Sequence, residues 1–191
     1  MKIKKIGAIC AKEKTFELLT KTGEDAGQWL GDGEAFYRID GLPELTPENI
    51  PFLFDISVDK AADMQIEHNG VPDSIDIAYH SEERELVPAG QTVTDVAGRV
   101  LMPMSTGNGL CYLVQGKYLN VLDEEVGYFL RRKPSGTPYI AARAGMFVIA
   151  IFRPYFDTEN NLASWLSTIA QQMKNTKLTD AVAMEVRADE S

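Results

Sequence analysis

Short apolar segments that alternate with turn-forming residues run through most of this chain and indicate a β-rich fold. The clearest turn is Gly31-Asp32-Gly33, which separates strand candidates at 28–30 and 34–39. Its two glycines can adopt the positive φ angles that tight hairpin turns require. Further strand candidates, bounded by turn signals such as Asn69-Gly70, lie at 64–68, 74–80, 85–87, 110–114, 126–132, 139–143 and 146–154. The last of these is strongly apolar, so we expect it near the centre of a sheet.

The N-terminal segment predicts another hairpin. Residues 3–11 and 15–21 are rich in apolar side chains, and the charged residues Lys12, Glu13 and Lys14 separate them. Two apolar runs joined by a short polar connection favour a pair of antiparallel strands.

Helix-start signals are also present. Thr46 is a candidate N-cap with Pro47 at the first helical position and Glu48 in the first turn, whereas Pro51 limits that helix to a short one. Residues 117–124 predict a second short helix or helical turn.

A longer helix is predicted near the C-terminus. Asp157 or Thr158 can cap it, and it runs to about residue 175. Its apolar stripe consists of Leu162, Trp165, Leu166, Ile169 and Met173. A last strand is predicted at 181–187.

Together these segments predict an α+β protein with a mostly antiparallel sheet, two short helices and one longer C-terminal helix. Residues 28–87 and 110–154 share an order of strand, short helix and three strands, so a doubled β-α-β-β-β unit is one interpretation. The 191 residues predict a single domain, or two lobes at 1–90 and 105–191 joined by a segment rich in Gly, Pro, Ser and Thr.

Composition restricts the compartment and the class of partner. No apolar run reaches the length of about 18 residues that spans a bilayer, and the N-terminus returns to charge too early for a signal peptide. The two cysteines, Cys10 and Cys111, lie in apolar runs and predict small buried side chains. We therefore expect a cytoplasmic protein that does not bind membranes.

The net charge of −9 is unevenly distributed. Residues 1–99 carry 10 Lys and Arg against 19 Asp and Glu, whereas residues 100–156 carry 6 against 3. An acidic chain of this kind is unlike a general nucleic-acid binder, but the second segment leaves room for a local basic face.

Few residues offer catalytic chemistry. His68 and His80 could meet across a turn beside Asp76 or Glu82 and form a zinc or iron site, although surface or capping roles explain both histidines as well. Neither cysteine has a basic partner nearby in sequence, and no serine lies in a nucleophile elbow. We expect a protein without a cofactor, and more readily a binding protein than an enzyme.

Two stretches carry resemblances to known families. The run QWLGDGEAFYRIDGLPELTPENIPFLFDI, at 28–56, resembles a family of small uncharacterised proteins carried by prophages and mobile elements of Gram-positive bacteria. In the other half, YLVQGKYLNVLDEEVGYFLRR, PYIAA and MFVIAIFRPY resemble the last part of a bacterial DNA sliding-clamp subunit. The doubled order of elements agrees with the repeated unit of a clamp.

The clamp resemblance implies contacts with DNA phosphates. The residues that it assigns to these contacts are basic and lie between 117 and 143: Lys117, Arg131, Arg132, Lys133 and Arg143. The alternative is that they are solvated residues at strand ends and turns.

Three functions follow as hypotheses. The leading one is a non-enzymatic binding or assembly protein of phage origin, with a clamp-like architecture, self-association and binding to double-stranded DNA. The first alternative is a phage-type regulator or inhibitor that binds a host protein through an acidic surface. The second alternative is a metal-dependent enzyme that uses His68 and His80.

Overall fold

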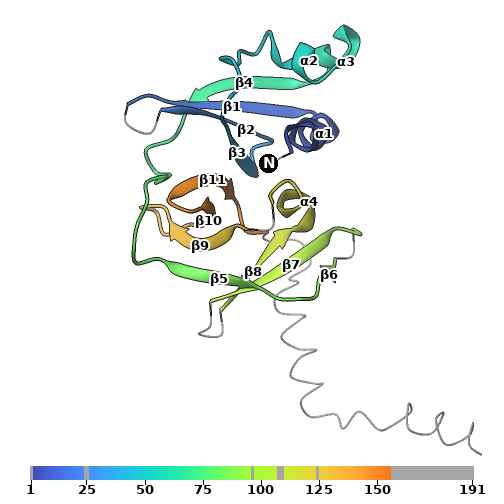
Figure 1. Ribbon diagram of the computed structural model, residues 1–191. Coiled ribbons are helices and arrows are strands. Elements are labelled where there is room, and N and C mark those ends of the chain that lie inside the picture. Colours follow the sequence, from blue (N-terminus) through green and yellow to red (C-terminus); the bar gives the residue numbers. More distant parts are fainter. Residues whose placement is uncertain (1, 24–25, 96, 107–109, 124, 156–191) are drawn as a thin grey trace, which may run out of the picture. The chain divides into compact units, whose positions relative to one another are not determined.

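The described residues, 2–23, 26–95, 97–106, 110–123 and 125–155 of the computed structural model, form an α+β fold around one large sheet (Figure 1). The helices are α1 Ile3–Glu13, α2 Ile50–Leu53, α3 Val58–Ala62 and α4 Gly116–Leu119. The strands are β1 Thr15–Lys21, β2 Gly27–Gly31, β3 Ala35–Ile39, β4 Gln65–Gly70, β5 Arg84–Pro88, β6 Val93–Thr94, β7 Val100–Ser105, β8 Cys111–Gln115, β9 Gly127–Arg132, β10 Pro138–Ala144 and β11 Phe147–Phe152. The helix predicted up to residue 175 and the strand predicted at 181–187 lie outside the described residues.

The strands follow the order β4-β1-β2-β3-β11-β10-β9-β5-β7-β6, and β8 pairs with β7. Among these pairs only β1 and β4 run parallel, which agrees with the predicted antiparallel sheet. The apolar strand β11 lies between β3 and β10 near the middle of the order, as its composition predicts. The predicted hairpin at 28–39 is confirmed by the antiparallel pairing of β2 with β3.

The same order of elements occurs on both sides of the β3–β11 pair. On one side α1 is followed by β1, β2 and β3, and on the other α4 is followed by β9, β10 and β11. The sheet order runs outward from the antiparallel β3–β11 pair as β2, β1 on one side and β10, β9 on the other. The described chain therefore contains two helix-and-three-strand segments joined edge to edge. The predicted repeat had other bounds: residues 110–154 follow the order strand, helix and three strands, but the prediction for 28–87 is wrong because two strands precede the helices there.

Residues 3–11 were predicted as a strand, and this prediction is wrong because they belong to helix α1. The buried side chains Ile6 and Cys10 are one helical turn apart, and the lysines occupy other faces. Lys14 then adopts a left-handed conformation with φ of 57°, which ends the helix and turns the chain into β1. Strand β1 itself agrees with the prediction at 15–21.

Other local predictions also need correction. Asn49, and not Thr46, is the residue that precedes α2, and its side-chain oxygen accepts a hydrogen bond from the Thr46 backbone N–H at 2.8 Å. Pro51 lies in the first turn of that helix. The segment rich in Gly, Pro, Ser and Thr that was predicted to join two lobes contains strands β6 and β7, and both belong to the sheet. Cys111 is exposed because it begins β8 at the end of its pairing with β7.

The predicted strand at 74–80 does not form. Residues 71–83, which we call the strap, instead cross from β4 to β5 without regular structure (Figure 1). Their apolar side chains Val71, Ile75 and Ile77 pack on the sheet, whereas Asp73 and Asp76 between them are exposed. A segment that covers a sheet face in this way has no neighbouring strand edge to pair with, so alternation of apolar residues is not sufficient for a strand.

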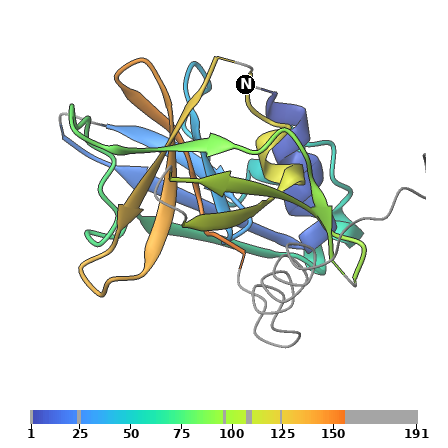
Figure 2. The same cartoon turned by 90° about the horizontal axis from the view of Figure 1, so that it is seen from below.

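The sheet buries apolar side chains on both faces. On the helix face, Ile6 and Cys10 of α1 and Tyr118 of α4 pack with strand residues such as Phe16 and Phe152. On the strap face, Ile77 packs with a second cluster of side chains: Leu19, Trp29, Phe36, Tyr139, Ala141, Val148 and Ile151. Figures 1 and 2 show α1 and α4 on one side of the strands and the strap on the other.

Candidate functional site

Helix α1 presents a row of lysines to solvent. Residues 2–14 contain five lysines and a single acid, Glu13, in a chain whose net charge is −9. Ile6 and Cys10 face the sheet, whereas Lys4, Lys5 and Lys12 are exposed. The helix therefore places positive charge outward on a protein that is otherwise strongly acidic.

Helix α4 lies beside α1. The Lys2 backbone N–H donates to the Val121 carbonyl at 3.2 Å, and Lys5 Nζ donates to the Asn120 carbonyl at 3.0 Å. Lys117 of α4 pairs with Glu13 at 2.6 Å. Two helices that are more than one hundred residues apart in sequence thus share one surface (Figure 2).

A buried aspartate fixes the position of α4. The carboxylate of Asp32, in the turn between β2 and β3, accepts hydrogen bonds from the Tyr118 hydroxyl at 2.9 Å and from the Ala35 backbone N–H at 3.0 Å. The Tyr37 hydroxyl donates to the Tyr118 carbonyl at 2.9 Å. The Asp32 side chain is only 2% exposed, so these bonds compensate its burial.

Burial of Cys10 on the sheet-facing side of helix α1 makes its thiol unreactive. Desolvation, reinforced by the nearby charge of Asp32, raises the pKa of the Cys10 thiol far above its ordinary value. The thiolate is the reactive form of cysteine, so this residue is a core side chain and not a nucleophile.

We call Lys4, Lys5, Lys12 and Lys117 the lysine face. Lys4 and Lys12 make no ion pair with the residues that the structure describes. Lys12 and Lys117 also border a cavity of about 460 Å³, together with Arg99 from the turn between β6 and β7. The lysine face can attract anions, since part of its charge is not neutralised within the protein.

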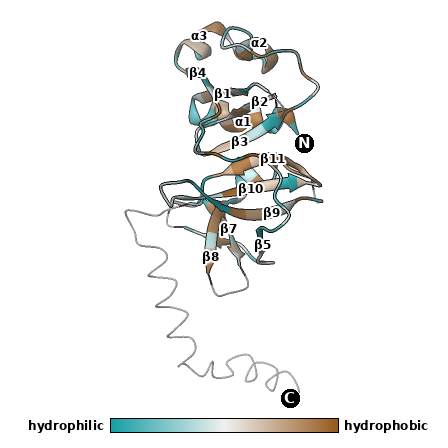
Figure 3. Cartoon of the chain, turned by 90° about the vertical axis from the view of Figure 1, so that its left-hand side faces the viewer, coloured by the Kyte–Doolittle hydropathy of each residue, from teal (hydrophilic) through white to brown (hydrophobic). Residues whose placement is uncertain are grey.

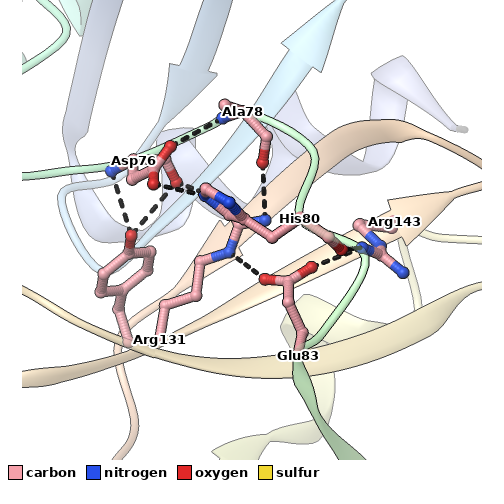
Figure 4. Close-up of polar contacts among 7 residues, drawn as sticks. Asp76, Ala78, His80, Glu83, Arg131 and Arg143 are labelled. Atoms are coloured by element: carbon pink, nitrogen blue, oxygen red, sulfur yellow. Dashed lines mark hydrogen bonds and ion pairs between the residues drawn. The ribbon is translucent and has the colours of Figure 1, made fainter.

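A second polar cluster fastens the strap to the sheet (Figure 4). Arg131 of β9 donates to Glu83 Oε1 at 2.5 Å, to the Asp76 carbonyl at 2.5 Å and to the Ala78 carbonyl at 2.8 Å. Arg143 of β10 pairs with the other oxygen of Glu83. The middle and the C-terminal end of the strap are therefore tied to strands β9 and β10 by guanidinium groups.

The charged side chains at the centre of the cluster are shielded from solvent. The Arg131 and Glu83 side chains are each 6% exposed. The Arg143 guanidinium carbon lies 3.7 Å from the Phe129 ring centroid and 4.9 Å from that of Tyr79, so the group is enclosed by aromatic rings. All of these contacts are internal, which indicates that the cluster stabilises the strap.

His80 and Asp76 form the exposed part of the cluster. His80 Nε2 lies 2.6 Å from Asp76 Oδ2, and the Ala78 N–H donates to the other carboxylate oxygen at 2.8 Å. Partial burial acts to raise the pKa of Asp76, but the hydrogen bonds from Ala78 and His80 and the charges of His80 and Arg131 outweigh it and lower that pKa. No nucleophilic side chain is bonded to this pair among the described residues.

The predicted metal ligands have separate surroundings. His68 is exposed on the edge strand β4, whereas the His80 ring bonds the Asp76 carboxylate within the strap. No group of three His, Cys, Asp or Glu side chains able to hold a metal ion occurs among the residues described.

The predicted phosphate ligands divide among three places. Lys117 belongs to the lysine face, whereas Arg131 and Arg143 lie in the strap cluster. Arg132 and Lys133 lie where β9 turns into β10, and Arg132 donates to the Gly136 carbonyl and to the Tyr112 hydroxyl.

Sequence reasoning missed the α1 lysines because residues 3–11 were assigned to a strand. The helical spacing of Ile6 and Cys10, with Ile3 one turn earlier, is the signal that could have found them. Glu83 was missed as well, and its two arginine partners lie more than forty residues away in sequence.

None of the described helices is long and apolar enough to cross a membrane. Comparison with known proteins adds no relative: no protein-family model, curated protein or solved structure matches this chain.

Proposed function

We propose that this protein is a non-enzymatic, DNA-associated binding protein that holds the phosphate backbone against its lysine face. The observation that carries the proposal is the pairing of α1 and α4, which gathers Lys4, Lys5, Lys12 and Lys117 on one surface. Exposed lysines that displace counterions from phosphates give affinity without sequence preference.

The repeated arrangement supports a clamp-like architecture. Each helix-and-three-strand segment contributes one helix to the shared surface, and the two segments join through β3 and β11. Such a unit could assemble with further copies and surround a duplex, with the helices toward the DNA. We propose self-association of this kind, and a phage origin, as parts of the same hypothesis.

The test uses a short fluorescein-labelled DNA duplex and fluorescence anisotropy. The variant Lys4→Glu/Lys12→Glu reverses two exposed charges on α1 that make no ion pair with the described residues. We expect wild-type binding to weaken as the salt concentration rises, and the variant to bind DNA more weakly. In a plot of log binding constant against log salt concentration, the slope of the variant should be shallower by about 0.9 for each phosphate contact removed.

The matched control is Lys133→Glu. Lys133 borders a cavity with Ile75 and Phe36 on the strap face. The substitution therefore reverses a charge of the protein without altering α1 or α4. Loss of binding in this control, with Lys4→Glu/Lys12→Glu unaffected, would move the interface to the β9–β10 turn. Absence of wild-type binding at low salt would refute the proposed function.

A second candidate function is favoured by the surface of α2 and α3. Phe52 is 79% exposed and Val58 is 82% exposed, and Asp55 and Asp59 lie between and beside them. Figure 3 shows hydrophobic colouring on parts of these short helices. An apolar centre among carboxylates fits a partner with an apolar pocket and a basic rim, as the regulator hypothesis requires.

This candidate is tested by affinity capture with the variant Phe52→Ser/Val58→Ser. The control is Val87→Ser on β5, where the valine is 58% exposed. A partner that the wild type and the control retain and the double variant loses supports the second function, whereas equal capture by all three excludes this surface.

A further inference from the structure

A cavity of about 310 Å³ opens on the strap face, between the β2–β3 turn, the start of β10 and the strap. Its walls include Phe36, Ile151 and Ile75, which belong to or pack against the second apolar cluster. The lysine face lies on the opposite side of the sheet, so this cavity is independent of the proposed DNA surface.

The floor of the cavity is apolar. Phe36 is 8% exposed and Ile151 is 5% exposed, and both belong to the second apolar cluster on the strap face. Tyr139 also borders the space, but its hydroxyl is already used because it donates to the Asp76 carbonyl. The floor therefore suits an apolar body, and the side chains of Phe36, Ile151 and Tyr139 offer it no free hydrogen-bonding group.

The charged groups of the lining are Glu34, Lys133 and Arg153. Glu34 and Arg153 pair with each other at 3.0 Å. Lys133 is half-buried and makes no ion pair with the residues that the structure describes. The lining thus carries one positive charge in excess, on a side chain next to an apolar floor.

We propose that this cavity binds a small apolar carboxylate, with the apolar part on Phe36 and Ile151 and the carboxylate at Lys133. The volume lies near the lower end of the range of about 300–1,000 Å³ that small-molecule pockets occupy, so the ligand is small. Because the site is partly shielded from water, the attraction between Lys133 and a bound carboxylate is stronger there than at a fully exposed lysine.

The test follows isoleucine methyl signals by NMR during titration with phenylacetate. Ile75 and Ile151 border the cavity, whereas Ile6 and Ile50 are buried on the helix face and serve as internal controls. We expect saturable shifts of the first two signals and no change of the other two. Acetate, which lacks the apolar body, should leave all four signals unchanged.

The charge requirement is tested with Lys133→Gln and with phenylacetamide, the neutral isostere. We expect the variant to bind phenylacetate at least tenfold more weakly and to bind phenylacetamide as the wild type does. Unchanged Ile6 and Ile50 signals would show that the variant is folded. A second variant, Thr137→Trp, alters the exposed rim of the cavity and should block both probes.

The inference is overturned if Ile75 and Ile151 do not shift with phenylacetate, indole-3-acetate or hexanoate. It is equally overturned if all four isoleucines shift together, or if Lys133→Gln and the amide make no difference. Because the readout is on the strap face, failure of DNA binding would not affect it.

Discussion

At the scale of single residues, Glu83 organises more of the structure than its isolated position in the sequence indicates. Its carboxylate accepts hydrogen bonds from Arg131 and Arg143, which lie on the adjacent strands β9 and β10, and its side chain is 6% exposed. Glu83→Gln removes the charge and leaves two guanidinium groups without their shared acid. We expect a loss of about 3 kcal/mol in the free energy of unfolding, measured by urea denaturation.

The control for this change is Glu85→Gln. Glu85 is exposed on β5, so the same substitution there should alter stability little. An equal effect of both variants would mean that the strap cluster does not hold the fold together.

Asp95 predicts how stability responds to acid. Burial acts to raise its pKa, but hydrogen bonds from Arg99 and Tyr155 and the charge of Arg99 outweigh it, so the pKa lies below its ordinary value of 3.8. A carboxyl with a lowered folded-state pKa stabilises the protein above the unfolded-state pKa. That contribution is lost as the pH falls through the lower folded-state value.

The measurement is thermal unfolding across the acid range for wild type and Asp95→Asn. We expect the variant to be less stable at neutral pH and to lose less stability than the wild type between about pH 5 and pH 2. Parallel pH curves for the two proteins would show that Asp95 contributes nothing to acid sensitivity.

At the scale of elements, the β2–β3 hairpin holds α4 in place through Asp32 and depends on a close backbone approach at Gly31. A Cβ atom at Gly31 would lie 1.8 Å from the Ala35 carbonyl oxygen, and a backbone atom cannot move aside cheaply. We expect Gly31→Ala to cost about 2 kcal/mol, measured by urea denaturation.

Gly70 provides the matched comparison, because a Cβ there meets only the Thr20 carbonyl oxygen at 4.0 Å. Gly70→Ala at the end of edge strand β4 should therefore change stability much less. If both substitutions are neutral, the hairpin has more freedom than its contacts indicate.

At the scale of the whole molecule, the proposed clamp-like assembly predicts a discrete oligomer. The described chain supplies two helix-and-three-strand segments, so ring closure would require several copies. Light scattering coupled to size exclusion, at low and moderate salt, should give one salt-stable mass larger than a dimer. A monomer or simple dimer would exclude a self-closed ring while leaving DNA binding by the lysine face to its own test.

The sequence predicted local structure well where one physical signal dominated. The glycines around Asp32 predicted the β2–β3 hairpin, and the apolar run at 146–154 predicted a central strand. Predictions failed where the same pattern fitted two structures. The apolar residues at 3–11 form a helix, and those at 74–80 pack on a sheet face without forming a strand.

By itself, therefore, the sequence determined the α+β class, most strand positions and the acidic net charge, because turn residues, apolar runs and charge act locally. Tertiary structure alone decided which residues share a surface. It placed Lys12 near Lys117, enclosed Arg131 and Arg143 around Glu83, and set Lys133 beside an apolar cavity. These neighbours are far apart along the chain, and only the pairing of strands and the packing of both sheet faces bring them together.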